Sequence, residues 1–175
     1  MMRTANPTFR FIADAMLGKL AKWLRILGYD VAYERKIEDV VLINRARVED
    51  RLILTRDAHL IRRRWSPPVS FILIEDDHLP EQLRQLVREL KLSVTDHLLT
   101  RCVECNEPLT VLPREETRRR VPPYVYKTQS EFAQCPRCSR IFWQGTHWER
   151  IRQRLQAFFP ERVAHPTHSE ESSHG

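Results

Sequence analysis

The chain has 175 residues and carries 29 Lys and Arg against 23 Asp and Glu, a formal net charge of +6. This length suits one domain of ordinary size, or about 100 residues with a small appendage. The positive charge favours a polyanionic partner such as nucleic acid. No apolar run is long enough to span a membrane and the N-terminus lacks a secretory signal, so we expect a cytoplasmic protein with no membrane partner.

The stretch from Phe9 to Leu27 begins as a strand and continues as a helix. Its first five residues are an apolar run interrupted only by Arg10, and this run ends at Asp14. The hydrophobic period then changes from two to about 3.6 residues, which predicts a helix that stops at Gly28. Because ligands of open α/β sheets bind at the carboxyl ends of strands, Asp14 is a candidate metal or phosphate ligand. The alternative is that Asp14 only caps the helix.

Strands and helices alternate along the chain as far as Leu90. The patterns predict strands over residues 29–33, 52–54 and 69–74, and helices over residues 40–48, 58–64 and 80–90. This alternation is typical of βαβ units with right-handed crossovers. We therefore predict a three-layer α/β/α domain with a mainly parallel sheet over residues 8–95.

Acidic residues follow the predicted strands or begin the predicted helices. They are Asp14, Asp39, Asp57, Asp76 and Asp77. Each alone is an ordinary cap or turn residue, but the carboxyl ends of parallel strands meet at one edge of a sheet, so we expect these carboxylates to lie together. Gathered carboxylates repel one another unless a cation is present, and hard oxygen ligands select magnesium or manganese. Such a site suits the hydrolysis of a phosphodiester.

The sequence lacks the motifs of several other common enzyme classes. The chain has only four glycines, and it contains neither a glycine-rich dinucleotide fingerprint nor a phosphate-loop lysine motif. These absences argue against a dehydrogenase or a kinase. A serine elbow and a lone cysteine paired with a base are also missing.

The cysteines form two Cys-x-x-Cys pairs in the second half of the chain. They are Cys102 and Cys105 in RCVEC, and Cys135 and Cys138 in CPRC. In a reducing compartment this spacing favours zinc over disulfides, and four thiolates fill a tetrahedral shell, so we expect a structural zinc. The predicted second module is a zinc ribbon over residues 96–160 that ends in a basic helix from Glu149 to Phe159. Residues 161–175 are rich in His, Ser and Glu, which predicts a disordered tail.

Arginines alternate with aromatic residues in this second module. Arg118 to Arg120 precede VPPYVY, and Arg140, Trp143 and Trp148 follow the second cysteine pair. Arginine and aromatic side chains are what a protein uses to bind the phosphates and bases of single-stranded RNA. The same residues also pack the faces of a small ribbon, so both interpretations stay open.

Long motifs in both halves of the chain resemble the Mut-seven C-terminal RNase domain family, a branch of the PIN-like nucleases with a C-terminal zinc ribbon. They are FIADAMLGKLAKWLRILGYD, RLILTRD, RCVECNEPL, RVPPYVY, FAQCPRC and GTHWER. The resemblance implies a PIN-like fold, metal-dependent endoribonuclease chemistry and an RNA substrate. By position it assigns the catalytic acids to Asp14, Asp39 and Asp57, with Asp76 or Asp77 as a further acid. It assigns phosphate binding to Lys22, Arg25 and Arg56.

Two main hypotheses follow from these observations. The first is a magnesium- or manganese-dependent endoribonuclease that uses the acidic cluster. The alternative is a non-catalytic RNA-binding protein that uses the zinc ribbon and the basic surface. A third hypothesis, a protein-binding partner of the toxin–antitoxin kind, depends on the PIN resemblance alone.

Overall fold

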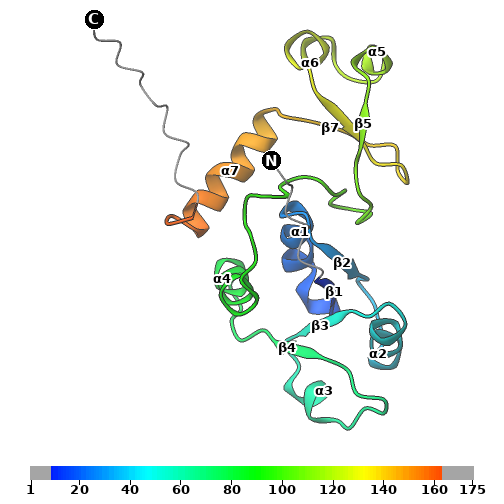
Figure 1. Cartoon of the computed structure of the whole chain (residues 1–175), viewed down its shortest axis with the longest axis vertical. Helices are drawn as coiled ribbons and strands as arrows, with labels where there is room; N and C mark the ends of the chain where they lie inside the picture. Colours follow the sequence, from blue (N-terminus) through cyan, green and yellow to red (C-terminus); the bar gives the residue numbers. More distant parts are fainter. Residues whose placement is uncertain (1–8, 163–175) are drawn as a thin grey trace, which may run out of the picture.

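The structure is a computed structural model that describes residues 9–162 (Figure 1). Most of the predicted tail over 161–175 therefore lies outside the described residues. A four-stranded parallel sheet has the order β2-β1-β3-β4. Its strands are β1 (Arg10–Ala13), β2 (Asp30–Tyr33), β3 (Leu52–Thr55) and β4 (Phe71–Leu73). The predicted α/β class and the mainly parallel sheet are confirmed.

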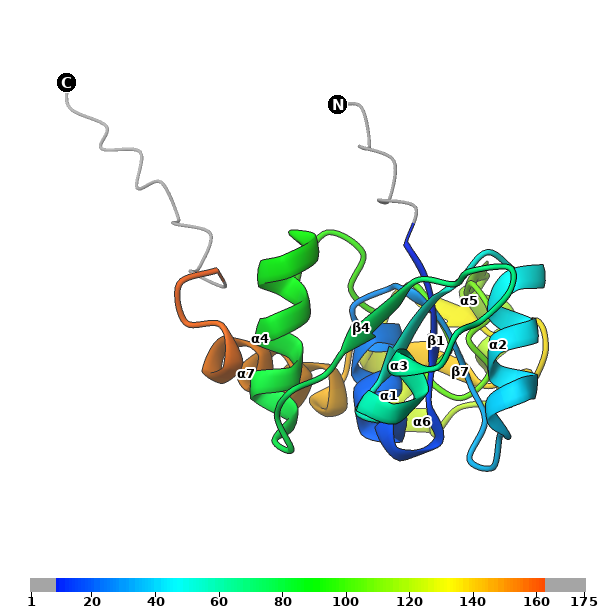
Figure 2. The ribbon, with the colours of Figure 1, turned by 90° about the horizontal axis from the view of Figure 1, so that it is seen from below.

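Helices cover both faces of this sheet. They are α1 (Gly18–Ile26) and α4 (Leu79–Leu90) on one face, and α2 (Asp39–Val48) and α3 (Ala58–Arg62) on the other. The side chains of β1 alternate accordingly, because Phe11 and Ala13 pack with α1 and α4 whereas Ile12 packs with α2 and α3. Figure 2 shows α4 and α2 on opposite sides of the strands. The three predicted layers are present.

The turn between β1 and α1 is tighter than the sequence pattern indicated. Asp14 has extended backbone angles, and its carboxylate accepts a hydrogen bond from the Ala15 amide at 2.6 Å. A short 3-10 turn, η1 (Ala15–Leu17), precedes α1. The apolar period runs through both segments, so periodicity alone predicted one helix.

Gly28 ends α1 in a conformation that only glycine adopts easily. Its φ is +93°, and a Cβ atom there would lie 2.2 Å from the carbonyl oxygen of His97. We expect Gly28→Ala to lower the free energy of unfolding by more than about 1 kcal/mol, because alanine suffers both the strained φ and the clash. Urea denaturation measures the change, and an unaltered unfolding midpoint would contradict this expectation.

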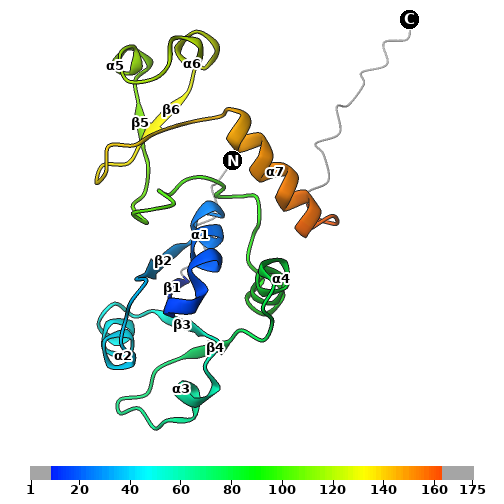
Figure 3. The same cartoon turned by 180° about the vertical axis from the view of Figure 1, so that it is seen from behind.

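The second module contains a small antiparallel sheet of order β5-β6-β7. Its elements are β5 (Thr110–Leu112), α5 (Arg114–Thr117), α6 (Pro123–Thr128), β6 (Phe132–Gln134) and β7 (Ile141–Trp143). Leu112, Val121 and Phe132 form its small core. Figure 3 shows this sheet with α5 and α6 at one end of the molecule.

The last helix, α7 (Thr146–Phe158), returns to the first module (Figure 3). Ile151, Leu155 and Phe159 join the core formed by α1, α4 and the parallel sheet. The rings of Trp23 and Phe158 lie 5.2 Å apart, and Arg84 donates a hydrogen bond from Nε to the Phe158 carbonyl at 2.9 Å. The domain boundaries at 95 and 160 stay a prediction, and α7 shares its core with residues on the far side of the first boundary.

Candidate functional site

Asp14 and Asp57 lie at the carboxyl edge of the parallel sheet and are connected by Thr55. The Thr55 hydroxyl donates to Oδ2 of Asp14 at 2.7 Å and accepts from the backbone N–H of Asp57 at 3.0 Å. Thr55 is fully buried at the end of β3, so this hydroxyl fixes the carboxylate of Asp14 relative to the following turn. The register of β1 beside β3 places both residues at this edge of the sheet.

The Asp57 side chain also begins a helix. Its Oδ1 accepts a hydrogen bond from the backbone N–H of His59 at 2.7 Å, so Asp57 is the N-cap of α3. Asp14 similarly accepts the Ala15 amide. Capping and site formation are therefore compatible, because each carboxylate has lone pairs beyond those that the backbone occupies.

The other three acids have partners of their own. Asp39, the first residue of α2, accepts a hydrogen bond from Nη1 of Arg63 at 3.3 Å. Asp77 forms an ion pair with Arg56. Asp76 accepts hydrogen bonds from the backbone N–H of His78 at 2.6 Å and from its ring, and these bonds lower the pKa of Asp76.

The five carboxylates do not converge in this structure. Among residues 9–162, the four cysteines are the one group of three or more His, Cys, Asp or Glu side chains whose ligand atoms lie close enough together to hold an ion. Asp14 and Asp57 are neighbours through Thr55, whereas Asp39, Asp76 and Asp77 contact cationic or histidine side chains. The sequence indicated the edge at which the acids lie but not these partners.

The prediction that Arg25 binds phosphate is corrected by its burial. The Arg25 side chain donates to the Val31 carbonyl from Nε and Nη2, at 2.9 and 2.8 Å, and Nη1 donates to the Val103 and Glu104 carbonyls, each at 2.9 Å. Burial lowers the pKa of Arg25, although Glu104 and nearby groups oppose that shift. This guanidinium therefore stabilises the fold, because its N–H groups donate to backbone carbonyls.

The other two predicted phosphate ligands are more accessible. Lys22 is exposed and pairs with Glu104 at 3.0 Å, which directs it toward the second module. Arg56 is half-buried beside Asp77, and its Nε is buried without a hydrogen-bond partner among the described residues. Arg56 therefore presents a partly exposed guanidinium at the acidic edge.

Arg63 is a cation at this edge that sequence reasoning missed. Besides contacting Asp39, its guanidinium lies 4.6 Å from the centroid of the Trp65 ring. The run Arg62 to Arg64, which begins five residues after Asp57, was the available signal. A charged run near a helix end usually faces solvent, and nothing in the spacing connects it with Asp39.

The cysteine cluster has the geometry of a tetrahedral metal site. Its four sulfurs lie within 4.8 Å of one another, and the Sγ atoms of Cys102 and Cys138 are 3.8 Å apart. Zinc–sulfur bonds of about 2.3 Å in a tetrahedron place sulfurs about 3.8 Å apart, so the four residues fit a metal ion such as zinc. Burial and the neighbouring thiols raise the pKa of Cys105 to about 12, whereas the Arg140 amide lowers the pKa of Cys138 to about 7. At such a pKa Cys105 is a thiol, so all four cysteines would be thiolates only around a bound cation.

The first cysteine pair is anchored to the edge strand β2. Asn106 accepts a hydrogen bond from the Val31 amide at 2.9 Å and donates to Oδ1 of Asp30 at 2.7 Å. Asp30 also accepts from the Arg51 guanidinium at 2.6 Å. Burial opposes the shift, but the hydrogen bonds from Arg51 and Asn106 outweigh it and lower the pKa of Asp30. The turn that begins the ribbon thus covers the open edge of the sheet.

We expect Asp30→Asn to lower the free energy of unfolding by about 2 kcal/mol at pH 7, because the side chain of Arg51 is only 6% exposed and would keep Glu49 as its one carboxylate partner. The depressed pKa stabilises the fold above the unfolded-state pKa, and this contribution disappears as the pH falls through the folded-state pKa. Urea denaturation at pH 7 and below pH 4 measures both effects, with Glu115→Gln as the exposed control. Equal losses at both pH values would contradict the assignment.

The chain thus joins an α/β domain with acids at the carboxyl edge of a parallel sheet to a ribbon whose four cysteines could hold a metal ion. The model of one family, described as the Mut7-C RNAse domain, matches residues 9–155. The chain therefore belongs to this family, and the resemblance noted from its motifs is confirmed. The family description indicates a nuclease-type function with RNA as the substrate. The search of curated proteins found no match, and the search of solved structures found none either.

Within residues 9–162, none of the helices has both the length and the apolar composition needed to cross a bilayer.

Proposed function

We propose that this protein is a metal-dependent endoribonuclease of the PIN-like type, and that its reaction centre is the carboxyl edge of the parallel sheet. The observation that carries the proposal is the Asp14–Thr55–Asp57 arrangement in a chain of an RNase domain family. A buried threonine hydroxyl that fixes one acid and the backbone of a second gives the site a rigid centre.

Carboxylate oxygens are the donors that magnesium and manganese prefer, so Asp14 and Asp57 fit such an ion and Asp39 is the third candidate. When bound, the ion would supply Lewis-acid polarisation of the phosphoryl group and a bound water of lowered pKa. Asp76 and Asp77 remain candidates of second rank, because they lie after β4 next to His78 and Arg56.

Basic side chains at the same edge can hold the scissile phosphate. Arg63 and Asp39 are each about half exposed, and ion pairs of this kind contribute about 1 kcal/mol or less. An incoming phosphate can therefore replace Asp39 as the ion-pair partner of Arg63. The carboxylate of Asp39 is then available as an additional oxygen ligand. Arg56, whose side chain is 32% exposed beside Asp77, supplies a second guanidinium.

Cleavage of labelled single-stranded and structured RNA by the full chain tests this proposal. We expect internal cuts that need added magnesium or manganese. A chelator alone is ambiguous because it also strips the cysteine site, so the informative step is restoration of cleavage by magnesium or manganese but not by zinc. RNA that stays intact with every ion would overturn the proposal.

A non-catalytic RNA-binding protein is the second candidate, and the separate partners of Asp39, Asp76 and Asp77 favour it. It predicts RNA affinity that falls steeply with salt, because each neutralised phosphate releases counterions. Asp14→Asn would then leave affinity unchanged or raise it, and no cleavage would occur. Cysteines held as thiolates suit a reducing compartment, which supports a cytoplasmic location for either candidate.

A further inference from the structure

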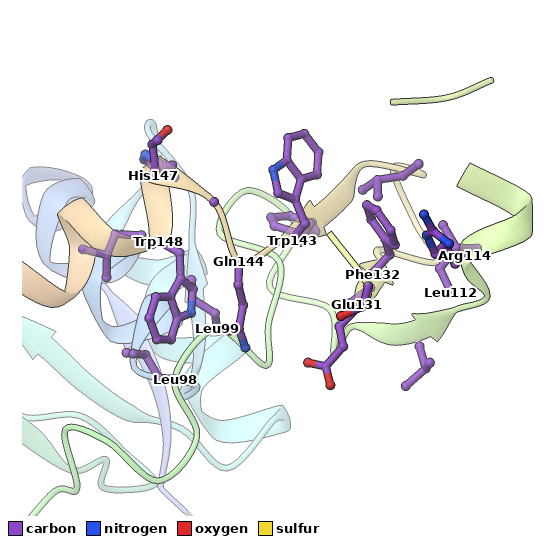
Figure 4. Close-up of a pocket in the computed structure, with 18 of the residues that line it drawn as sticks. Leu98, Leu99, Leu112, Arg114, Glu131, Phe132, Trp143, Gln144, His147 and Trp148 are labelled. Atoms are coloured by element: carbon purple, nitrogen blue, oxygen red, sulfur yellow. The ribbon is translucent and has the colours of Figure 1, made fainter. Parts of the chain in front are cut away.

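A cavity of about 730 Å³ separates the ribbon from α7 and the segment that joins the two modules. Figure 4 shows Trp148 beside Leu98 and Leu99 on one side of it, and Phe132 with Arg114 on the other. Its volume lies in the range of small-molecule sites, about 300 to 1,000 Å³. The space is too large for a packing defect in a ribbon this small.

Both aromatic and polar side chains line this cavity. Trp143 and Trp148 are partly buried, so each keeps some accessible ring surface. Glu131 and Gln144 extend into the space between the two walls (Figure 4). A carboxylate and an amide between apolar rings are suited to the hydrogen-bonding edge of a planar heterocycle.

The module that contains the cavity carries a net positive charge, which favours an anionic ligand. Residues 96–162 carry 12 Lys and Arg against 8 Asp and Glu, a net charge of +4. The Arg152 guanidinium lies 4.8 Å from the centroid of the Trp148 ring, and Arg114 lines the opposite wall. A site with rings for stacking and nearby guanidinium groups matches a nucleotide better than it matches an uncharged apolar peptide.

We infer that this cavity binds an unpaired nucleobase of RNA, so that the ribbon and α7 hold a single-stranded segment of the substrate. The inference rests on the proposed function only in taking RNA as the ligand. The base stacks on the partly buried ring of Trp148, its polar edge meets Glu131 and Gln144, and its phosphates face the surrounding arginines. A paired base cannot enter, because its polar edge is occupied and its faces are stacked.

Two variants test this binding site in a full-length protein that also carries Asp14→Asn, so that cleavage does not interfere. Trp148→Leu keeps an apolar side chain against Leu98 and Leu99 but removes the large ring, and Gln144→Ala changes an exposed residue that the fold does not need. Tyr124→Ala is the matched control, because Tyr124 is a 75% exposed aromatic residue of the same ribbon that does not line the cavity.

We expect Trp148→Leu to weaken binding of a fluorescent single-stranded RNA about tenfold, the effect of losing one stacked base, and Tyr124→Ala to change it less than about twofold. Gln144→Ala should weaken binding by a smaller factor. The dependence of affinity on salt should stay unchanged in both cavity variants, since no phosphate contact is lost. Affinity for a fully paired RNA should also stay unchanged.

The inference is overturned if both cavity variants bind single-stranded RNA as tightly as the parent, or if they weaken paired and single-stranded RNA equally. Circular dichroism and metal content confirm that each variant is folded. Failure of the nuclease proposal would appear separately, as RNA left uncut by the wild-type protein, and it would not alter this comparison of affinities.

Discussion

Replacing Asp14 with Asn is expected to lower the rate of RNA cleavage by at least about a hundredfold, which is the scale of losing one positioned acid–base or ligand group. The asparagine oxygen can still accept the Ala15 amide, so the turn into η1 keeps its hydrogen bond. What disappears is the negative charge beside Thr55 and the pair of oxygens that would hold the ion. Single-turnover cleavage with saturating manganese measures the effect.

The matched control for this substitution is Asp50→Asn. Asp50 is exposed, precedes β3 and so lies at the opposite edge of the sheet, and its φ of +49° is one that asparagine tolerates well. Cleavage by this control should equal that of the wild type. Equal rates for the Asp14 and Asp50 variants would remove the strand edge as the reaction centre.

Thr55→Val provides a graded version of the same test. Valine keeps the buried shape, but it loses the hydroxyl that connects Asp14 with the Asp57 amide. We expect cleavage to fall about tenfold with RNA affinity unchanged, as is usual for groups that orient a ligand. An unchanged rate of cleavage would show that Thr55 serves only the fold.

Substituting Cys102 with Ser is expected to release the metal and unfold the ribbon. This residue is fully buried, and a small module with three residues in its core depends on a bound ion for much of its stability. Metal analysis by atomic absorption and amide hydrogen exchange over residues 98–145 measure the two effects. Arg137→Ser, at an exposed position in the CPRC turn of the second cysteine pair, is the control and should retain one ion per chain.

The effect of metal loss should extend into the first module. Arg25 and Asn106 connect β2 with the turn between Cys102 and Cys105, so that turn cannot unfold without freeing the edge strand. We expect exchange protection of the β2 amides to fall together with that of the ribbon. Protection of β2 that survives in the Cys102 variant would show that the two modules are stable independently.

Hydrophobic patterning predicted the parallel sheet and the edge on which Asp14 and Asp57 lie, because a buried strand and an amphipathic helix each need a specific period. It did not predict the partner of Arg25. Periodicity states which face of α1 is buried, but the carbonyls that Arg25 contacts belong to residues 31, 103 and 104. The ion pair between Arg63 and Asp39 was missed for the same reason, since tertiary contacts leave little local signal.

The cysteine cluster was the easiest part of the structure to predict. A metal site of this kind needs two residues between the cysteines of each pair, and this spacing can be read from the sequence. The role of α7 was harder. Its pattern correctly indicated a helix, although the structure begins it at Thr146 instead of Glu149. Which surface the helix covers depends on the path of the whole ribbon, and no local rule gives that path.

The return of α7 to the first module has a practical consequence for dissecting the protein. A fragment cut at residue 95 would lose Ile151, Leu155 and Phe159, and it would expose the apolar surface of α1 and α4 that they cover. Such a fragment should aggregate on expression. Separating catalysis from the ribbon therefore calls for point substitutions in the intact chain, or for a rearranged gene that fuses the last helix directly behind α4.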